Sequence, residues 1–191
     1  MKSPLITIRH RAVHEAGHAV VAILMLGADS VECVWINTDP SVNTGQLGCT
    51  RPRPMFENQA MLPAVEVARG LFITVMRLLG SRVAIPLLGE TIDPMADEFS
   101  HDDPPIEEMI DKYVTSLRQL LDGTFPTGFE EVRDFEIAQG VHWFLLTKTR
   151  NLLEANVDLL KAVADALVDR GCLNTEDLQK LLEANPGQPS T

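Results

Sequence analysis

A short apolar segment of the chain carries three ionisable side chains, and this combination restricts the fold more than any other feature. Residues 12–26 are almost all Ala, Val, Ile, Leu and Met, with His14, Glu15 and His18 placed among them. Gly27 follows the segment, and glycine commonly ends helices. We expect one helix to run through this segment and to end at its last residue.

The three ionisable residues match the His-Glu-x-x-His pattern of zinc hydrolases. Residues four apart lie on one helix face, so His14 and His18 can present two imidazoles to one zinc ion. Glu15 lies about 100° around the helix from His14, near the open side of such a metal. Zinc lowers the pKa of its bound water to near 7, and Glu15 would act as general base on that water. The pattern therefore predicts zinc-dependent hydrolysis.

A catalytic zinc ion needs a third protein ligand. His10 shares the face of the two histidines, but three histidines at successive turns span about 12 Å, too far for one ion. We therefore interpret His10 as part of the helix start. The open alternatives are His142 and an acidic loop that contains Asp93, Asp97, Glu98, His101, Asp102 and Asp103.

The rest of the chain predicts a mainly α fold with a small antiparallel β-hairpin or sheet. Residues 30–37 favour a strand, and residues 45–50 are its expected hairpin partner. We expect one domain over residues 1–185 and a flexible tail over 186–191. The further helices are expected at 58–79 (ended by Gly80), 82–88 (a short turn), 104–121, 129–154, 156–171 and 174–185.

Charge and composition exclude some classes of partner. The formal net charge is -11, and the chain has no cluster of basic residues, so we expect no nucleic-acid partner. The longest apolar run, residues 19–26, is too short for a bilayer, so we expect no membrane insertion. Three scattered cysteines, Cys33, Cys49 and Cys172, do not form a disulfide framework and indicate a cytoplasmic protein.

Several segments resemble the peptidase domain of FtsH-type AAA zinc proteases over about residues 10–185. Residues 12–21, Ala-Val-His-Glu-Ala-Gly-His-Ala-Val-Val, are similar to the zinc helix of that family. Residues 31–36 and 45–50 resemble its β-hairpin with a Leu-Gly motif. Residues 79–84 resemble its Gly-Gly-Arg-Ala-Ala segment, and residues 152–182 its terminal helices. The resemblance implies a zinc endopeptidase fold.

The resemblance also implies a third ligand. In the family, an Asp from a Ser-x-Asp element at a helix start completes the zinc site, and Ser100-His101-Asp102 matches that element. Asp102 is therefore the expected ligand, with Asp103 and His101 as the alternatives.

Three departures from the family leave other functions open. Ile85 stands where the family usually has Glu, the loop before Ser100 is longer, and the arginine before the hairpin turn is missing. No P-loop sequence GxxxxGK[ST] occurs, so we expect any ATP dependence to come from a separate ATPase partner. We expect a peptidase that cuts peptides or unfolded protein, alone or as a homo-oligomer. The alternatives are an inactive metal-binding or protein-interaction module with the same fold, and a metal-free structural protein.

Overall fold

The computed structural model describes residues 7–39, 41–42, 47–53, 63–90, 106–120 and 130–186. Over these residues the chain is mainly helical with one small antiparallel sheet, as the sequence predicts. The helices are α1 (Ile8–Leu26), α2 (Ala64–Leu87), α3 (Ile106–Leu120), α4 (Glu130–Glu154), α5 (Val157–Arg170) and α6 (Thr175–Ala184). A 3-10 turn, η1 (Ala28–Ser30), leads into the sheet of β1 (Val31–Ile36), β2 (Gly48–Pro52) and β3 (Cys172–Asn174).

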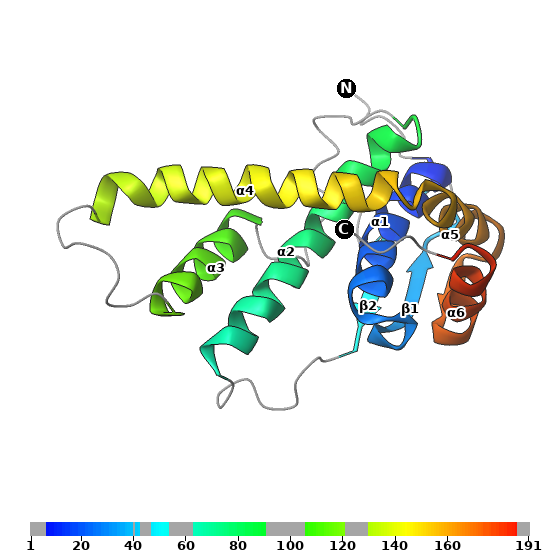
Figure 1. Ribbon diagram of the computed structural model, residues 1–191. Coiled ribbons are helices and arrows are strands. Elements are labelled where there is room, and N and C mark those ends of the chain that lie inside the picture. Colours follow the sequence, from blue (N-terminus) through cyan, green and yellow to red (C-terminus); the bar gives the residue numbers. More distant parts are fainter. Residues whose placement is uncertain are drawn as a thin grey trace, which may run out of the picture.

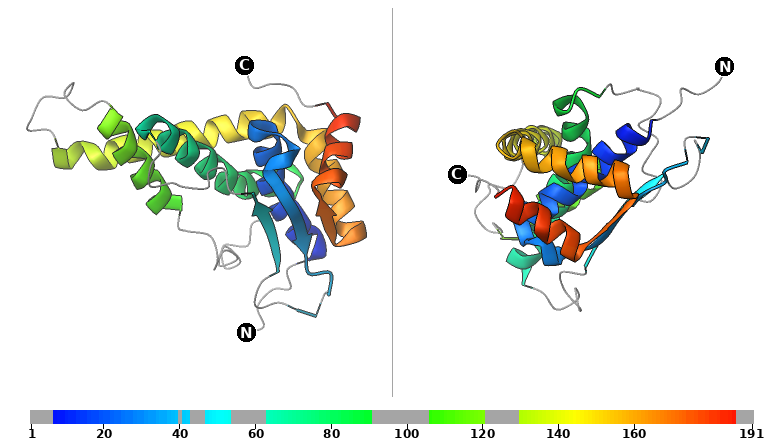
Figure 2. Two further views of the ribbon diagram at one scale, coloured as in Figure 1. Left: turned by 90° about the horizontal axis from the view of Figure 1, so that it is seen from below. Right: turned by 90° about the vertical axis from the view of Figure 1, so that its right-hand side faces the viewer.

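Helix α1 lies at the centre of the fold, between the sheet and the other helices. It packs most extensively on α2, then on α5, and it also contacts β1 and β2. Figures 1 and 2 show α4 running along the length of the molecule, from α3 at one end to α5 at the other. The hydrophobic core follows α1, whose residues 19–23 are all buried. The segment that carries the His-Glu-x-x-His pattern is thus a core helix.

The sheet has the order β2-β1-β3, and both outer strands run antiparallel to β1. Val34 pairs with Thr50 on one side and with Leu173 on the other, and all three side chains are buried. Since alternate residues of a strand point to opposite faces, Gly48 and Thr50 share the face that meets α1. The predicted hairpin pairing is confirmed, with β2 extending to Pro52, whereas β3 was missed.

Helix α2 corrects one prediction. Gly80 was expected to end a helix, with a separate turn over 82–88, but α2 continues through Gly80 to Leu87. The reason is a close helix crossing. A Cβ atom on Gly80 would lie 2.5 Å from the carbonyl oxygen of Gly17, and one on Gly17 would lie 2.4 Å from the carbonyl oxygen of Gly80. Both glycines allow the backbones of α1 and α2 to touch, which is a use of glycine other than helix termination.

Helix α2 is also the one described segment with the length and composition of a membrane span. Residues Val65–Leu87 have a mean hydropathy of 1.5, and 56% of that stretch is buried inside the structure. A core helix has the same properties, so this finding is weak evidence for a membrane span. The absence of membrane insertion stays a prediction.

The remaining helix predictions are confirmed within a few residues at each end over the described residues, and residues 130–154 form a single helix, α4. Asn174 caps α6 in a reciprocal arrangement in which its side chain accepts a hydrogen bond from the backbone N–H of Asp177, whose carboxylate accepts one from the N–H of Asn174. The predictions for residues 45–46, 58–62, 104–105, 121–129 and the tail at 187–191 lie outside the described residues.

Candidate metal centre

His14 and His18 project from α1 toward a common point. Their Nε2 atoms lie 3.2 Å apart, with the rings nearly perpendicular at 83°. Two imidazoles bound tetrahedrally to one zinc ion at 2.0–2.1 Å place their nitrogens about 3.3 Å apart. The separation set by the helix therefore fits two ligands of one zinc ion.

The second ring nitrogen of His18, Nδ1, also has a hydrogen-bond partner. Its Nδ1 atom lies 2.9 Å from the backbone carbonyl oxygen of Arg77 in α2, so Nδ1 carries the proton and Nε2 keeps its lone pair. A hydrogen bond of this kind fixes the orientation of metal-binding histidines in many proteins. The side chain is 5% exposed, and burial lowers its pKa from 6.5 to about 4, against the raising effect of the Arg77 carbonyl. His18 is therefore neutral at physiological pH, as a metal ligand must be.

Glu15 lies on the side of α1 that faces the sheet and is 7% exposed. The Thr50 hydroxyl lies 2.9 Å from Glu15 Oε2 and 3.1 Å from the backbone carbonyl oxygen of Glu15. Gly48 lies against the same side chain, because a Cβ atom built there would lie 2.7 Å from Glu15 Cγ. Strand β2 therefore forms one wall around the carboxylate.

Arg11 is a buried residue near the site that sequence reasoning missed. From the first turns of α1, its guanidinium donates hydrogen bonds to three backbone carbonyl oxygens, those of Asn37, Asp39 and Val42. These contacts hold the segment after β1 against α1. The sequence shows only a basic residue near a helix start, because carbonyl acceptors leave no sequence pattern.

The described residues bring together only part of the predicted site. Within them, no group of three His, Cys, Asp or Glu side chains could hold a metal ion. The predicted third ligand, Asp102, lies outside the described residues, as do the other candidates of the acidic loop: Asp93, Asp97, Glu98, His101 and Asp103. Ile85, where the resemblance leads one to expect Glu, is a buried core residue of α2.

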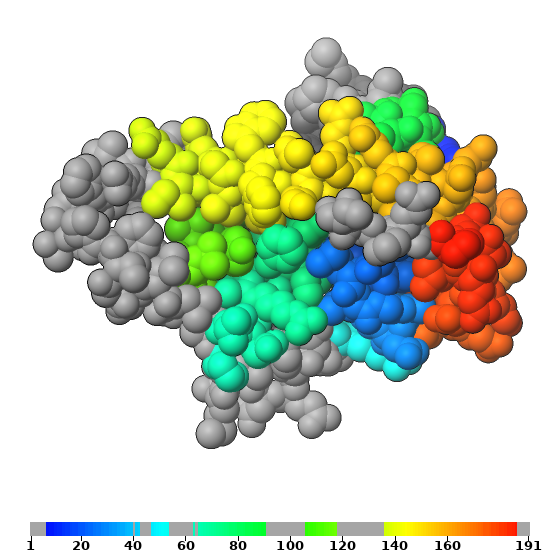
Figure 3. All heavy atoms as spheres, in the orientation of Figure 1, coloured from blue at the N-terminus to red at the C-terminus, as the bar shows by residue number. Residues whose placement is uncertain are grey.

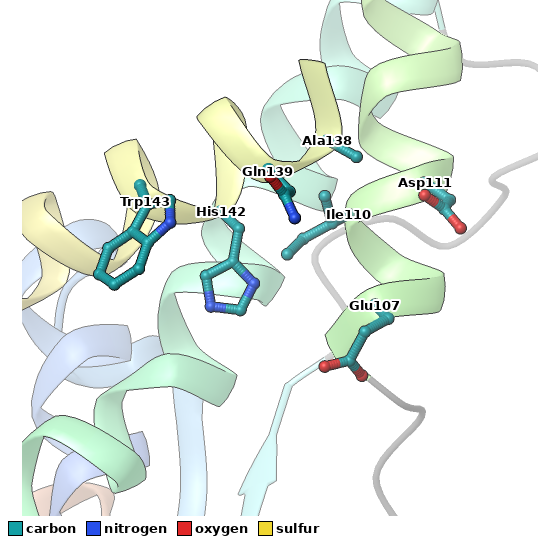
Figure 4. A pocket seen from close by; sticks show the side chains of 7 residues that line it. All are labelled: Glu107, Ile110, Asp111, Ala138, Gln139, His142 and Trp143. Atoms are coloured by element: carbon teal, nitrogen blue, oxygen red, sulfur yellow. The ribbon is translucent and has the colours of Figure 1, made fainter. Parts of the chain in front are cut away.

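The remaining alternative ligand, His142, lies in a different place. It lines a cavity of about 420 Å³ between α3 and α4, to which α1 contributes no residue. Figure 4 shows its imidazole on the α4 side of this cavity, with Glu107 and Asp111 on α3. The other lining residues are Ile110, Ala138, Gln139 and Trp143. This cavity is thus separate from the His14 and His18 pair.

Comparison with known proteins identifies relatives for almost the whole chain. It is 31% identical over 186 residues, 92% of the chain, to ATP-dependent zinc metalloprotease FtsH 2 of Symbiobacterium thermophilum. It is also 31% identical to ATP-dependent zinc metalloprotease FtsH 1 of Sorangium cellulosum over 91% of the chain. A 27% identity to ATP-dependent zinc metalloprotease FtsH of the Aster yellows witches'-broom phytoplasma covers 90% of the chain.

This chain is an FtsH-related sequence. The FtsH-related chain spans 30%, 29% and 25% of the length of these three relatives, so their whole-protein activity does not transfer to it directly. No protein-family model matches the sequence. The names of these relatives state that they are zinc metalloproteases, and the 3.2 Å separation of the His14 and His18 Nε2 atoms fits two ligands of one zinc ion.

Proposed function

We propose that this FtsH-related chain is a zinc-dependent metallopeptidase that hydrolyses internal peptide bonds. The observation that carries the proposal is the pair of Nε2 atoms 3.2 Å apart on α1, next to a buried carboxylate of the same helix. Burial of the Glu15 carboxylate and the His18 imidazole costs hydration that packing alone does not return, since buried polar groups must recover the hydration they lose. A catalytic role explains why these two residues lie in the core.

His14, His18 and Asp102 would hold the metal, with Nε2 as the donor atom of both histidines. When bound, zinc would supply Lewis acidity that lowers the pKa of water to near 7 and polarises the carbonyl oxygen of the scissile bond. The Arg77 carbonyl keeps the His18 ring oriented through Nδ1, and burial keeps that ring neutral. The protein thereby keeps the donor atoms in place before any metal arrives.

Glu15 would take the proton from the attacking water and then transfer it to the amine nitrogen of the leaving peptide. A carboxylate adjacent to a ligand histidine can serve both steps, because the attacking oxygen and the leaving nitrogen become bonded to the same carbon, within reach of one side chain. The contact with β2 sets where that carboxylate lies.

The substrate would bind as an extended strand along β2. Among the described strands, β2 is at one edge of the sheet, with β1 on its inner side. Its residues Gly48 and Thr50 contact Glu15, so a peptide paired with β2 would pass beside the catalytic carboxylate. Main-chain pairing of this kind favours unfolded segments over folded protein.

Cytoplasmic unfolded protein is the proposed substrate class. A separate ATPase or further copies of the chain are the proposed partners.

The decisive experiment compares wild type with Glu15→Gln after zinc loading, using fluorescein-labelled casein and a quenched fluorescent peptide mixture. We expect the variant to lose activity by about 10²- to 10⁴-fold while keeping its zinc, since a general base contributes rate enhancements of that size. Glu183→Gln, an exposed position on α6, is the matched control and should cleave like wild type.

Two outcomes would overturn the proposal. A Glu15→Gln protein that cleaves as fast as wild type would remove Glu15 from the chemistry. A zinc-loaded wild type that cleaves none of these substrates would favour the alternative of an inactive metal-binding or protein-interaction module.

A further inference from the structure

We propose that Thr50 is a positioning residue for the Glu15 carboxylate, a role that rests on the proposed peptidase function. Thr50 is on β2, far from α1 in the sequence, and its side chain is 7% exposed. Its hydroxyl lies 2.9 Å from Glu15 Oε2. A short hydroxyl contact between two buried side chains of different elements is the kind of support that a reacting group requires.

The hydroxyl of Thr50 has two acceptors within reach and one proton to donate. The backbone carbonyl oxygen of Glu15 lies 3.1 Å away and is already part of the α1 helix, whereas the carboxylate oxygen is closer and charged. Hydrogen bonds to ionised acceptors are the stronger ones, so the carboxylate is the favoured partner.

Gly48 completes the support two residues earlier on the same face of β2. A Cβ atom there would lie 2.7 Å from Glu15 Cγ and 2.9 Å from Oε1, so any larger residue would displace the carboxylate. One residue therefore holds Oε2 by a hydrogen bond, and the other leaves the space that the side chain occupies. Glu has three rotatable side-chain bonds, and this arrangement restricts them before substrate binds.

A purely structural role for Thr50, tying β2 to α1, predicts different behaviour. It predicts that removing the hydroxyl weakens folding and leaves the chemistry of each folded molecule unchanged. A positioning role predicts a lower kcat with little change in KM and in zinc affinity, because the hydroxyl acts through the Glu15 carboxylate that it contacts. The two roles can therefore be separated by measurement.

The test uses Thr50→Val, which keeps the side-chain shape, and Thr50→Ser, which keeps the hydroxyl. Thr149→Val is the matched control, because Thr149 is fully buried in α4 and donates to the Leu145 carbonyl oxygen at 2.8 Å. Cleavage of the quenched peptide mixture is measured on zinc-loaded protein, and zinc affinity by competition with a chromophoric chelator. We expect kcat to fall by about tenfold to a hundredfold in Thr50→Val, with recovery in Thr50→Ser and no fall in Thr149→Val.

A second readout needs no activity. Urea unfolding of metal-free wild type, Thr50→Val, Glu15→Met and the double variant forms a cycle that measures the coupling between the two side chains. Favourable coupling supports the proposal. Zero coupling, or a Thr50→Val enzyme with the kcat of wild type, overturns it. A wild type without peptidase activity would instead refute the proposed function, and the coupling would still report on the contact.

Discussion

Helices α1 and α4 depart from the usual distribution of polar and apolar side chains in opposite ways. Helix α1 buries Glu15 and His18, while α4 leaves Trp143 at 67% and Phe144 at 52% exposure. Figure 3 shows α4 along the upper part of the molecule, whereas residues 11–13 and 15–23 of α1 are buried. Each helix also carries histidine and glycine, so the same residue types can be compared in both settings.

The difference lies in what the surrounding elements impose. The polar groups of α1 meet partners from two other elements, the Arg77 carbonyl of α2 and the Thr50 hydroxyl of β2. The exposed rings of α4 have neighbours on their own helix: the Lys148 Nζ atom lies 6.0 Å from the Phe144 ring centre, and the His142 ring centre lies 6.5 Å from that of Trp143. Identical substitutions in the two helices should therefore have very different effects.

The largest effect should come from histidine substitution. His18→Ala removes one of the two convergent Nε2 donors, and we expect zinc affinity to fall by more than about 100-fold, because even second-shell changes cost 10- to 100-fold. His142→Ala on α4 should bind zinc like wild type. Isothermal titration calorimetry with zinc measures both. Equal loss in the two variants would place the metal elsewhere.

The second-largest effect should be a change with pH in the free energy of unfolding of the metal-free protein. The unfolded chain protonates His18 near pH 6.5, whereas the folded chain does so only near pH 4. The unfolded state therefore binds more protons in this window, and the free energy of unfolding should fall as the pH drops from about 6.5 to 4, by up to about 3 kcal/mol.

The contribution of His18 is isolated by comparing wild type with His18→Gln in urea titrations at several pH values. The difference between the two proteins should change over this window and be constant above about pH 7. A difference that stays constant from pH 7 to pH 4 would show that His18 is not buried in a neutral form.

The third effect should come from glycine substitution, which we expect to change the free energy of unfolding in opposite directions in the two helices. Gly17→Ala on α1 puts a Cβ atom 2.4 Å from the Gly80 carbonyl oxygen of α2, and we expect about 1–3 kcal/mol less stability from overpacking. Gly140→Ala on α4 meets nothing within 4 Å and should add about 0.5–1 kcal/mol, because alanine is the better helix former. Thermal and urea unfolding measure both, and changes of the same sign would contradict the close crossing.

The smallest effect should come from the exposed aromatic residues. Trp143→Ser should change the free energy of unfolding by less than about 0.5 kcal/mol, as expected for a surface position. Leu145→Ala, two positions along and fully buried, should cost about 2–5 kcal/mol and shows that the assay is sensitive to α4. A large loss in Trp143→Ser would mean that this surface is covered in solution.

The helix that carries His14 and His18 and the mainly helical fold class followed from spacing alone, because helix periodicity and the four-residue step are local properties, whereas zinc binding by this helix stays a prediction. Gly80 could not be placed correctly, since a glycine that ends a helix and one that admits a neighbouring backbone look alike in sequence. The sequence likewise predicted no role for Thr50, because its contact depends on how two distant segments pack. The alternation of the predicted strand puts Gly48 and Thr50 on one face, but only the packing of β2 on α1 shows that this face meets Glu15.

The crossing of α1 and α2 has a consequence for protein engineering. Gly80 and Arg77 lie about one helical turn apart, so the contact that brings Gly80 against Gly17 also brings the Arg77 carbonyl to His18. Grafting the five-residue motif onto another helix would therefore transfer the donor atoms without their orientation. To keep the orientation of the histidine, the engineered protein would need a second helix whose backbone contacts the grafted helix. That second helix would also have to offer a free carbonyl oxygen about one turn from the point of contact.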